Sequence, residues 1–327
     1  MSTHISVPPQ LLLERILTLE IVRVTERAAV SAARLRGHGN EKAADQAAVD
    51  AMRRELNKLP IQGTVVIGEG ERDEAPMLFI GEEVGAGEGP AVDIAVDPLE
   101  DTTLCAKNQP DAICVLAMAE RGGLLNAPDV YMQKIAIGSG YPEGTVDLDM
   151  SPKENIASLA KAKGVAIEEI TAVMLDRPRH AALLEDLRST GCAIKLISDG
   201  DIAGIIHAVN TEDTGIDIYI GSGGAPEGVL AAAALRCIGG QMQGRLMLDN
   251  EEKRERARRM GIDDPNRKYK TNELASGDVL FAATGVTDGS LLRGVKYLRG
   301  GRMTTDSVVM RASSGTVRWV KGDHRVE

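Results

Sequence analysis

The segment DIAVDPLEDTT, residues 93–103, gathers residues that can do chemistry at the point where an apolar run ends. Asp97 is followed by Pro98, and a second carboxylate, Glu100, and a hydroxyl, Thr102, come soon after. Proline fixes the backbone after the predicted strand, so the two carboxylates can meet at one cation and the hydroxyl can face a water molecule on it. The alternative is an acidic turn that binds no ligand. The positions of the other acidic residues help to decide between these two interpretations.

Three further acidic residues lie at the end of an apolar run or near the start of a predicted helix, namely Asp45, Glu69 and Glu227. Hard oxygen ligands in this number suit Mg²⁺ or Mn²⁺. Metal-assisted phosphoryl hydrolysis commonly uses two such ions, one beside the attacking water and one beside the leaving oxygen. Each residue alone also has a structural interpretation: a helix cap for Glu227, a solvated helix face for Asp45 and an acidic turn for Glu69.

Composition excludes several classes of protein. A net charge of -10 and an aromatic content of 2% disfavour a nucleic-acid-binding surface, which is usually basic and offers rings for stacking. No apolar run approaches the ~20 residues of a membrane span, and the first residues lack a signal-peptide pattern. The four cysteines show no paired spacing, which indicates reduced thiols. We therefore expect a soluble cytoplasmic protein with neither nucleic-acid nor membrane partners.

Apolar periodicity predicts an α/β chain. Before Gly164 it indicates helices at residues 9–36, 42–56 and 151–163 and strands at 64–67, 91–96 and 112–119. After Gly164 short apolar strands alternate with helices, which is typical of parallel βα units on a sheet covered on both faces. We place a soft domain boundary near residue 165. Residues 1–165 would then form a metal-binding catalytic domain, and residues 166–327 an α/β domain that contributes substrate residues and one metal ligand.

Several of these motifs resemble those of the lithium-sensitive, metal-dependent sugar and inositol phosphatases: GEGE around Glu69, DPLEDT after the strand and GGAPEG around Glu227. Within that superfamily the chain closely resembles the class II fructose-1,6-bisphosphatases, some of which also hydrolyse sedoheptulose 1,7-bisphosphate. The resemblance covers nearly the whole chain and includes the segments AADQAAVDAM, VVIGEGERDEAPML, VDIAVDP, NAPDVYM, RPRH, SDGD, GGAPEGV and ATGVTDG. It implies a layered α-β-α-β-α sandwich of the sugar phosphatase type and a homodimer or homotetramer.

The resemblance also implies a role for each residue at a matching position. Thr102 falls on the catalytic threonine, which helps to position and deprotonate the attacking water. The metal positions are Asp45, Glu69, Asp97, Glu100 and Glu227. The substrate positions are Glu100, Thr102, Tyr131, Arg177, Arg179, Asp199, Asp201 and Gly224.

The chemistry of the substrate positions fits these roles. Two arginines can hold a distal phosphate bidentately, the SDGD carboxylates can accept hydrogen bonds from sugar hydroxyls, and a glycine admits a ligand close to the backbone. Each position has a structural alternative, such as a surface ion pair for Arg179 or a half-buried core tyrosine for Tyr131. His180 is a candidate general acid, although a lone histidine is more often structural.

The chain departs from the family pattern at two positions. The turn usually reads D-P-x-E-G-T, and here Asp101 stands at the glycine position. Glycine there would permit unusual backbone angles and close approach of N–H groups to phosphate, whereas aspartate adds a negative charge. Asn40 stands where the family often has aspartate, which would alter a contact near Asp45.

The sequence therefore predicts metal-dependent hydrolysis of the 1-phosphate of fructose 1,6-bisphosphate to fructose 6-phosphate and phosphate, in gluconeogenesis or the Calvin cycle. The alternatives are an inositol or other sugar phosphatase of the same superfamily, or a sugar-phosphate-binding regulator whose catalysis is weakened by Asp101. An aspartyl-phosphate mechanism at SDGDIAG is disfavoured because Ala203 stands where a hydroxyl residue is needed. A dinucleotide site at GAGEGP is disfavoured because the glycine spacing is wrong.

Overall fold

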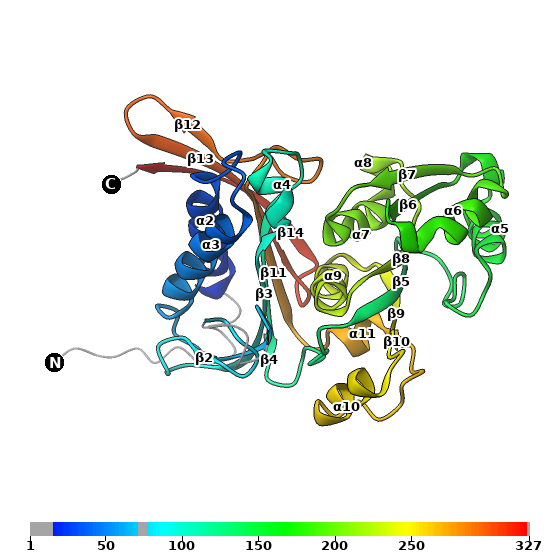
Figure 1. Cartoon of the computed structure of the whole chain (residues 1–327), viewed down its shortest axis with the longest axis horizontal. Coiled ribbons are helices and arrows are strands. Elements are labelled where there is room, and N and C mark those ends of the chain that lie inside the picture. Colours follow the sequence, from blue (N-terminus) through cyan, green and yellow to red (C-terminus); the bar gives the residue numbers. More distant parts are fainter. Residues whose placement is uncertain (1–15, 71–76, 326–327) are drawn as a thin grey trace. The chain divides into compact units, whose positions relative to one another are not determined.

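The computed structural model describes residues 16–70 and 77–325. The chain divides into two compact units, drawn with their elements in Figure 1. Unit 1 consists of residues 1–123 and 277–327, and unit 2 consists of residues 124–276. The chain thus leaves unit 1 once and returns to it. The boundary that we expected near residue 165 lies inside unit 2.

Unit 1 is built on a mixed sheet that has eight strands in the described part of the chain. Their order is β12-β13-β11-β4-β3-β1-β2, and β14 pairs with β13. Strands β1 and β3 run parallel, so their carboxyl ends lie side by side. The strands are β1 Gln62–Ile67, β2 Glu83–Val84, β3 Ala91–Glu100, β4 Ile113–Glu120, β11 Val279–Gly285, β12 Lys296–Leu298, β13 Arg302–Arg311 and β14 Thr316–Arg325.

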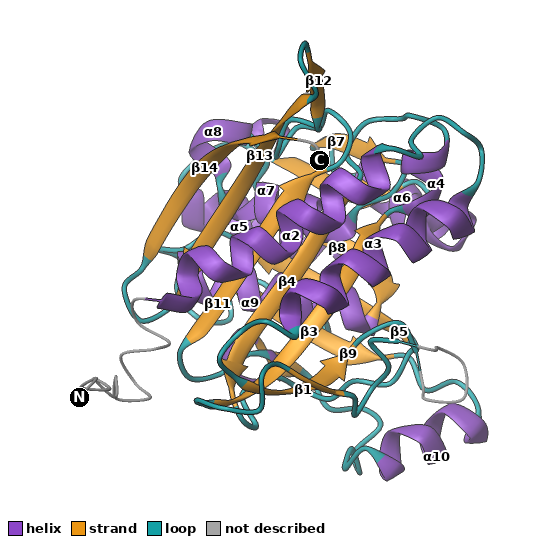
Figure 2. Cartoon of the chain, turned by 90° about the vertical axis from the view of Figure 1, so that its left-hand side faces the viewer, coloured by secondary structure: helices purple, strands orange, loops and turns teal. Residues whose placement is uncertain are grey.

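Helices α2 (Leu17–Ala33) and α3 (Glu41–Leu56) pack on this sheet, and Figure 2 shows them lying across one of its faces. Buried apolar residues recur at helical spacing along α2, and they share one core with inward-facing strand residues such as Ile94. The helix expected at residues 9–36 is confirmed from Leu17 onward, and the expected position Leu13 lies outside the described residues. A short helix, α4 (Thr102–Ala106), follows β3 directly.

Unit 2 contains a six-stranded sheet in the order β10-β9-β5-β8-β6-β7. Strand β6 is parallel to β7 and β8, as the alternation of strands and helices predicted. Strand β5 is antiparallel to β8 and β9, so the sheet is mixed rather than parallel throughout. The strands are β5 Tyr131–Ile137, β6 Thr171–Leu175, β7 Ala193–Ile197, β8 Ile218–Gly224, β9 Gln241–Leu246 and β10 Tyr269–Lys270.

Helices cover both faces of the sheet of unit 2. Ile135 of β5 belongs to a core that includes residues of α5 and α6, whereas the next residue back, Lys134, faces α7 and α9. Successive strand residues point to opposite faces, so the two helix pairs lie on opposite sides. The helices are α5 Pro152–Lys163, α6 Ala181–Arg188, α7 Asp201–Val209, α8 Thr211–Thr214, α9 Ala225–Ile238, α10 Glu251–Arg259 and α11 Thr271–Leu274, with short 3₁₀ turns at Ile167–Glu169 and Pro178–His180. The α/β class is confirmed.

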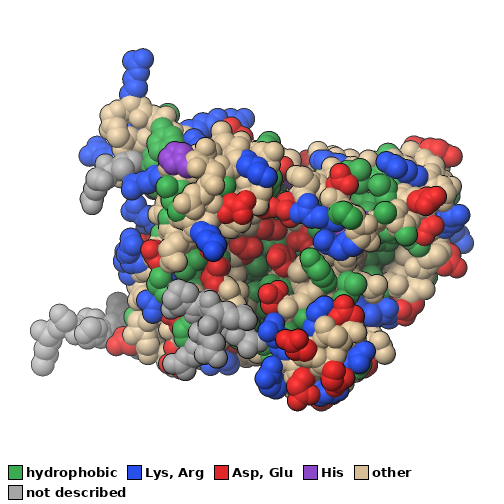
Figure 3. All heavy atoms as spheres, viewed as in Figure 1, with side chains coloured by type: hydrophobic (Ala, Val, Ile, Leu, Met, Phe, Trp, Pro, Cys, Tyr) green, Lys and Arg blue, Asp and Glu red, His purple; other side chains and the backbone are tan. Residues whose placement is uncertain are grey.

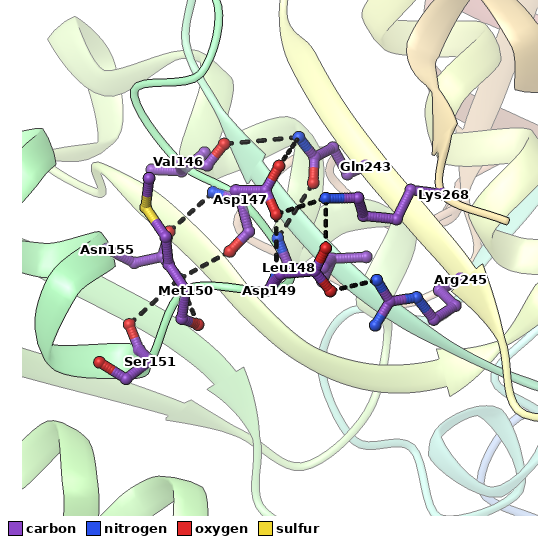
Figure 4. A network of polar contacts seen from close by, with 10 residues as sticks. All are labelled: Val146, Asp147, Leu148, Asp149, Met150, Ser151, Asn155, Gln243, Arg245 and Lys268. Atoms are coloured by element: carbon purple, nitrogen blue, oxygen red, sulfur yellow. Dashed lines mark hydrogen bonds and ion pairs between the residues drawn. The ribbon is translucent and has the colours of Figure 1, made fainter. Parts of the chain in front are cut away.

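Polar contacts hold the segment between β5 and α5 against β9, as Figure 4 shows. Lys268 Nζ lies 2.6 Å from carboxylate oxygens of both Asp147 and Asp149. Gln243 Nε2 donates to Asp147 at 3.1 Å, and the Asn155 side chain both accepts from Asp147 N and donates to its carbonyl. This long connection is therefore a fixed part of unit 2.

Helix α10 carries interleaved acidic and basic side chains, visible at the bottom of Figure 3, and most of them are exposed to solvent. The expectation about the thiols holds. All four cysteines are free and buried. Among the described residues, no helix is long and apolar enough to cross a membrane.

Candidate active site

In unit 1, two of the predicted metal ligands follow neighbouring parallel strands. Glu69 comes two residues after the end of β1, and Asp97 lies three residues before the end of β3. Ile67 pairs with Ala95, so the two carboxylates extend from the same edge of the sheet. The strand register therefore positions both residues.

A third predicted ligand, Asp45, acts electrostatically on Glu69. Burial, and then the charge of Asp45, raise the pKa of Glu69 to about 8. Burial also raises the pKa of Asp45 itself. Asp45 lies in the second turn of α3, whose first turn is capped by Asn40 Oδ1, which accepts from Ala43 N at 3.0 Å. The departure at Asn40 thus leaves the helix that carries Asp45 well capped.

The turn after β3 is compact and largely buried. Asp97 Oδ1 accepts from Leu99 N at 3.2 Å, and the Glu100 side chain is buried. The thiol of Cys114, on the neighbouring strand β4, has a pKa well above its usual range because of burial first, and then because of nearby charges that include Asp97 and Asp45. The same buried region therefore holds Asp97 close enough to Asp45 for both to act on one group.

Asp101 has a local structural function that the sequence did not reveal. It is the N-cap of α4, and its Oδ1 accepts from Thr103 N at 2.8 Å and from Leu104 N at 3.2 Å. Its φ of -119° is ordinary for any residue, so this chain does not need glycine at the position. The carboxylate therefore occupies two N–H groups at the start of α4 that a phosphate could otherwise approach.

Thr102 is the first residue of α4. Its neighbour Thr103 donates its hydroxyl to Glu41 Oε1 at 2.9 Å, which ties α4 to the start of α3. Within residues 16–70 and 77–325, no hydrogen bond is recorded for the Thr102 hydroxyl. A hydroxyl on a fixed turn, with no competing partner in the described chain, is suited to contact a water molecule or a substrate.

The carboxylate oxygens of the predicted ligands in unit 1 are of the chemical type that binds a divalent ion, although these side chains do not form a compact metal-binding cluster. Among the described residues, no three His, Cys, Asp or Glu side chains form a group that could hold a metal ion. The observation in favour of a cation is the raised pKa of Glu69 beside Asp45, because like charges away from water need a positive neighbour. Three acidic residues that follow Glu69 lie outside the described part of the chain, namely Glu71, Asp73 and Glu74.

In unit 2, the predicted substrate residues lie just after the ends of β6 and β7, at the last residue of β8 and at the first residue of β5. Arg177 pairs with Asp199. The Arg179 guanidinium lies over the ring of Tyr131, with 4.5 Å between Cζ and the ring centroid. Arg179 and Tyr131 are both exposed, so a ligand can reach this stacked pair. The structure thus brings four of the predicted substrate residues into two contacting pairs.

His180 is a structural partner rather than a general acid. The backbone N–H of Ser222 donates to His180 Nε2 at 2.9 Å, so Nε2 is an acceptor and the proton is on Nδ1. Nδ1 lies 2.8 Å from the Leu175 carbonyl and donates to it. Burial lowers the pKa of His180, and the charges of Arg179 and Arg177 also lower it, which favours the neutral ring that the hydrogen bonds require.

Two further predicted residues of unit 2, Asp201 and Glu227, share a buried charge cluster that sequence reasoning missed. Asp201 pairs with Lys134, and the exposed fractions of these side chains are 5% and 0%. The pKa of Glu227 is raised by burial and by the charge of Asp201, and Lys134 opposes that rise. The available signal was one lysine inside the apolar run of residues 132–137.

Gly224 has a packing reason that was not expected. A Cβ atom at this position would lie 1.9 Å from Glu227 Oε2, so the glycine makes room for the carboxylate of Glu227. That Oε2 atom is buried and has no hydrogen-bond partner among the described residues. A buried carboxylate oxygen without a donor is well suited to bind a cation.

Comparison with known proteins defines the class first: the chain is a phosphatase. It belongs to the family of bacterial fructose-1,6-bisphosphatases encoded by glpX, whose pattern matches residues 15–324. A relative from Synechococcus sp. (strain JA-3-3Ab), a D-fructose 1,6-bisphosphatase class 2/sedoheptulose 1,7-bisphosphatase, is 46% identical over 94% of this chain and 95% of its own length. A relative of the same description from Synechococcus elongatus is also 46% identical, over 95% of this chain and 97% of its own length.

Membership of this family means that the chain hydrolyses a phosphate of fructose 1,6-bisphosphate, as the sequence predicted, and it implies a divalent metal cofactor. The individual roles of the site residues stay predictions.

The raised pKa of Glu69 predicts how the metal-free protein responds to pH. The folded protein keeps a proton up to about pH 8 that the unfolded chain releases near the ordinary value of 4.5. Between these values the folded state binds more protons, so stability falls as pH rises, by at most about 1.4 kcal/mol per pH unit from this group. Denaturant midpoints in chelator should show a weaker decline for Glu69→Gln, and equal slopes would contradict the account.

Lys134 is expected to stabilise unit 2 strongly through Asp201. Lys134→Met should destabilise the protein by about 3–5 kcal/mol, because it leaves a buried carboxylate without its cation. The matched double variant Lys134→Met with Asp201→Asn removes both charges and should recover most of that loss. Urea unfolding followed by circular dichroism compares the three proteins. A double variant no more stable than Lys134→Met would show that the ion pair is not the cause.

Proposed function

We propose that the chain hydrolyses the 1-phosphate ester of fructose 1,6-bisphosphate with Mg²⁺ or Mn²⁺ held by the acidic residues at the strand ends of unit 1 and by Glu227. The proposed ligands are Asp45, Glu69, Asp97, Glu100 and Glu227. The observation that carries this is the pKa of Glu69, which burial and then the charge of Asp45 raise, because a divalent ion would favour the charged carboxylate there. When bound, such ions lower the pKa of water and neutralise phosphate charge.

Thr102 is proposed as the catalytic hydroxyl. It lies two residues after the buried Glu100, at the start of α4, and its hydroxyl has no recorded partner in the described chain. The Thr102 hydroxyl accepts a hydrogen bond from the attacking water. This hydrogen bond orients the water so that its oxygen faces phosphorus. The oxygen of water bonds to phosphorus as the P–O bond to the sugar breaks in line. The attacking water gives up one proton to solvent, and the departing sugar oxygen takes one proton from solvent.

Unit 2 is proposed to hold the rest of the substrate. Arg177 and Arg179 bind the second phosphate, and the exposed ring of Tyr131 supports the second arginine. Asp199 and Asp201 are proposed to face sugar hydroxyls, and Gly224 to line the same site. Support for the roles of Arg177, Asp199, Arg179 and Tyr131 is that these residues lie together in two contacting pairs.

Three finer statements belong to this proposal. The names of the curated relatives suggest that sedoheptulose 1,7-bisphosphate is a second substrate. The working form is proposed to be a cytoplasmic homodimer or homotetramer. An inositol phosphatase is less well supported, because the arginine pair is suited to a second phosphate that inositol monophosphates lack.

Phosphate release from fructose 1,6-bisphosphate tests the function. With Mg²⁺ or Mn²⁺ the wild type should release phosphate, and with chelator it should not. Thr102→Ala should lower kcat by at least about a hundredfold, because general acid–base and positioning contributions are of this size. Thr102→Ser, which keeps the hydroxyl, is the matched control. Equal rates for wild type and Thr102→Ala would remove the role given to Thr102.

The capping geometry of Asp101 predicts separate effects on stability and on rate. Asp101→Asn keeps a capping oxygen and removes the charge, whereas Asp101→Gly removes both; the loss of stability should be a few tenths of a kcal/mol for glycine and smaller for asparagine. If the charge repels the substrate phosphate, both variants should show a lower KM for fructose 1,6-bisphosphate. A lower KM in the glycine variant alone would point instead to the freed N–H groups of Thr103 and Leu104.

A further inference from the structure

Strand β8 continues beyond the end of its parallel neighbour β6. The pairs between them are Ala172 with Ile218 and Val173 with Tyr219, and β6 ends at Leu175 while β8 runs on to Gly224. On the other side, Ser222 lies opposite Gln133 of β5. Ser222 turns its backbone N–H and C=O toward the place where β6 would have continued, and buried backbone groups need partners there.

Two consecutive side chains replace the missing strand. His180 Nε2 accepts from Ser222 N at 2.9 Å, and Arg179 Nη2 donates to Ser222 O at 2.8 Å. His180 Nδ1 donates to the carbonyl of Leu175, the last residue of β6, at 2.8 Å. The last two residues of the 3₁₀ turn Pro178–His180 thus complete the hydrogen bonding of an interrupted sheet.

The Ser222 hydroxyl links Arg179 to His180, and the donor and acceptor of each hydrogen bond can be assigned. Arg179 Nε lies 3.3 Å from Ser222 Oγ and donates to it, and Oγ lies 2.9 Å from His180 Nε2. Because an arginine only donates and Nε2 is an acceptor, the hydroxyl accepts from Arg179 and points its proton at His180. His180 and Ser222 are both buried, with exposed fractions of 5% and 7%, so this acceptor set is fixed by packing.

The result is a guanidinium with a defined plane. The Nε and Nη2 groups of Arg179 are bound to Ser222, and its flat face lies over Tyr131. Within the described residues no hydrogen bond is recorded for Nη1, which is therefore available to an anion. An arginine fixed in advance loses less conformational entropy when it binds phosphate.

We propose that His180 and Ser222 are positioning residues that hold Arg179 for the second phosphate of the substrate and thereby set the preference for a bisphosphate. This inference rests on the proposed function, in which Arg179 binds that phosphate. His180 acts through Arg179 and not on the reacting phosphate. Its effect should therefore appear in binding of the sugar-phosphate end and not in the chemical step.

Two substitutions at one position separate the two hydrogen bonds of His180. The amide nitrogen of asparagine can occupy the place of Nδ1, so His180→Asn keeps the bond to Leu175 and loses the acceptor for Ser222. The longer glutamine reaches the place of Nε2, so His180→Gln keeps the acceptor and loses the bond to Leu175. His207→Asn, at another buried histidine of unit 2, is the matched control for the substitution itself.

The readouts are steady-state constants with Mg²⁺ and fructose 1,6-bisphosphate, and inhibition constants for fructose 6-phosphate and for inorganic phosphate. His180→Asn should raise KM and the inhibition constant of fructose 6-phosphate by about tenfold or more, as expected when a hydrogen bond to a charged group is lost. The inhibition constant of inorganic phosphate, and kcat, should stay within about threefold. His180→Gln should raise KM less than His180→Asn, and His207→Asn should not raise it.

Three results would overturn the inference: an unchanged KM in His180→Asn, a parallel rise in the inhibition constant of inorganic phosphate, or an equal effect of asparagine and glutamine. If His180→Asn does not fold, Ser222→Ala decides, because it removes only Oγ and should raise KM by about threefold to tenfold. Wild-type protein that releases no phosphate from fructose 1,6-bisphosphate would contradict the proposed function itself. If the wild type is active but the variants give any of the three overturning results, only the role of His180 and Ser222 is contradicted.

Discussion

Negative charge in surroundings shielded from water is the constraint on which the site depends. In unit 2 the chain meets it internally, because Lys134 is fully buried beside Asp201 and opposes the rise in the pKa of Glu227. In unit 1, by contrast, burial and then the charge of Asp45 raise the pKa of Glu69 to about 8. One unit carries its own cation, and the other has an arrangement that a divalent ion from solution would stabilise.

Local structure then fixes where these charges lie. The ends of the parallel strands β1 and β3 place Glu69 and Asp97 at one edge of the sheet. Asp45 and Thr102 are positioned instead by the capped first turns of two helices. Asn40 caps the helix of Asp45, and Asp101 caps the helix that begins with Thr102. Each functional residue is thus held by a strand end or a helix start whose hydrogen bonds are satisfied within a few residues.

The sequence predicted the elements well and their grouping poorly. Apolar periodicity placed the strand at 91–96 and the helix at 151–163 close to their observed bounds, because these patterns depend on local burial. It could not show that residues 277–327 return to the sheet of unit 1, since strand pairing over such separation leaves no local signal. For the same reason the antiparallel placement of β5 was not foreseen.

The site was predicted through motifs, which name residues but not their partners. The ionic partner of Asp201 and the neutral form of His180 follow from contacts between segments far apart in sequence, and no spacing rule contains them. The most direct test of the central claim is anomalous X-ray diffraction from crystals grown with Mn²⁺. The account predicts manganese coordinated by Glu69 and Asp97 of unit 1. Manganese bound only at other side chains, or no manganese at these two, would contradict it.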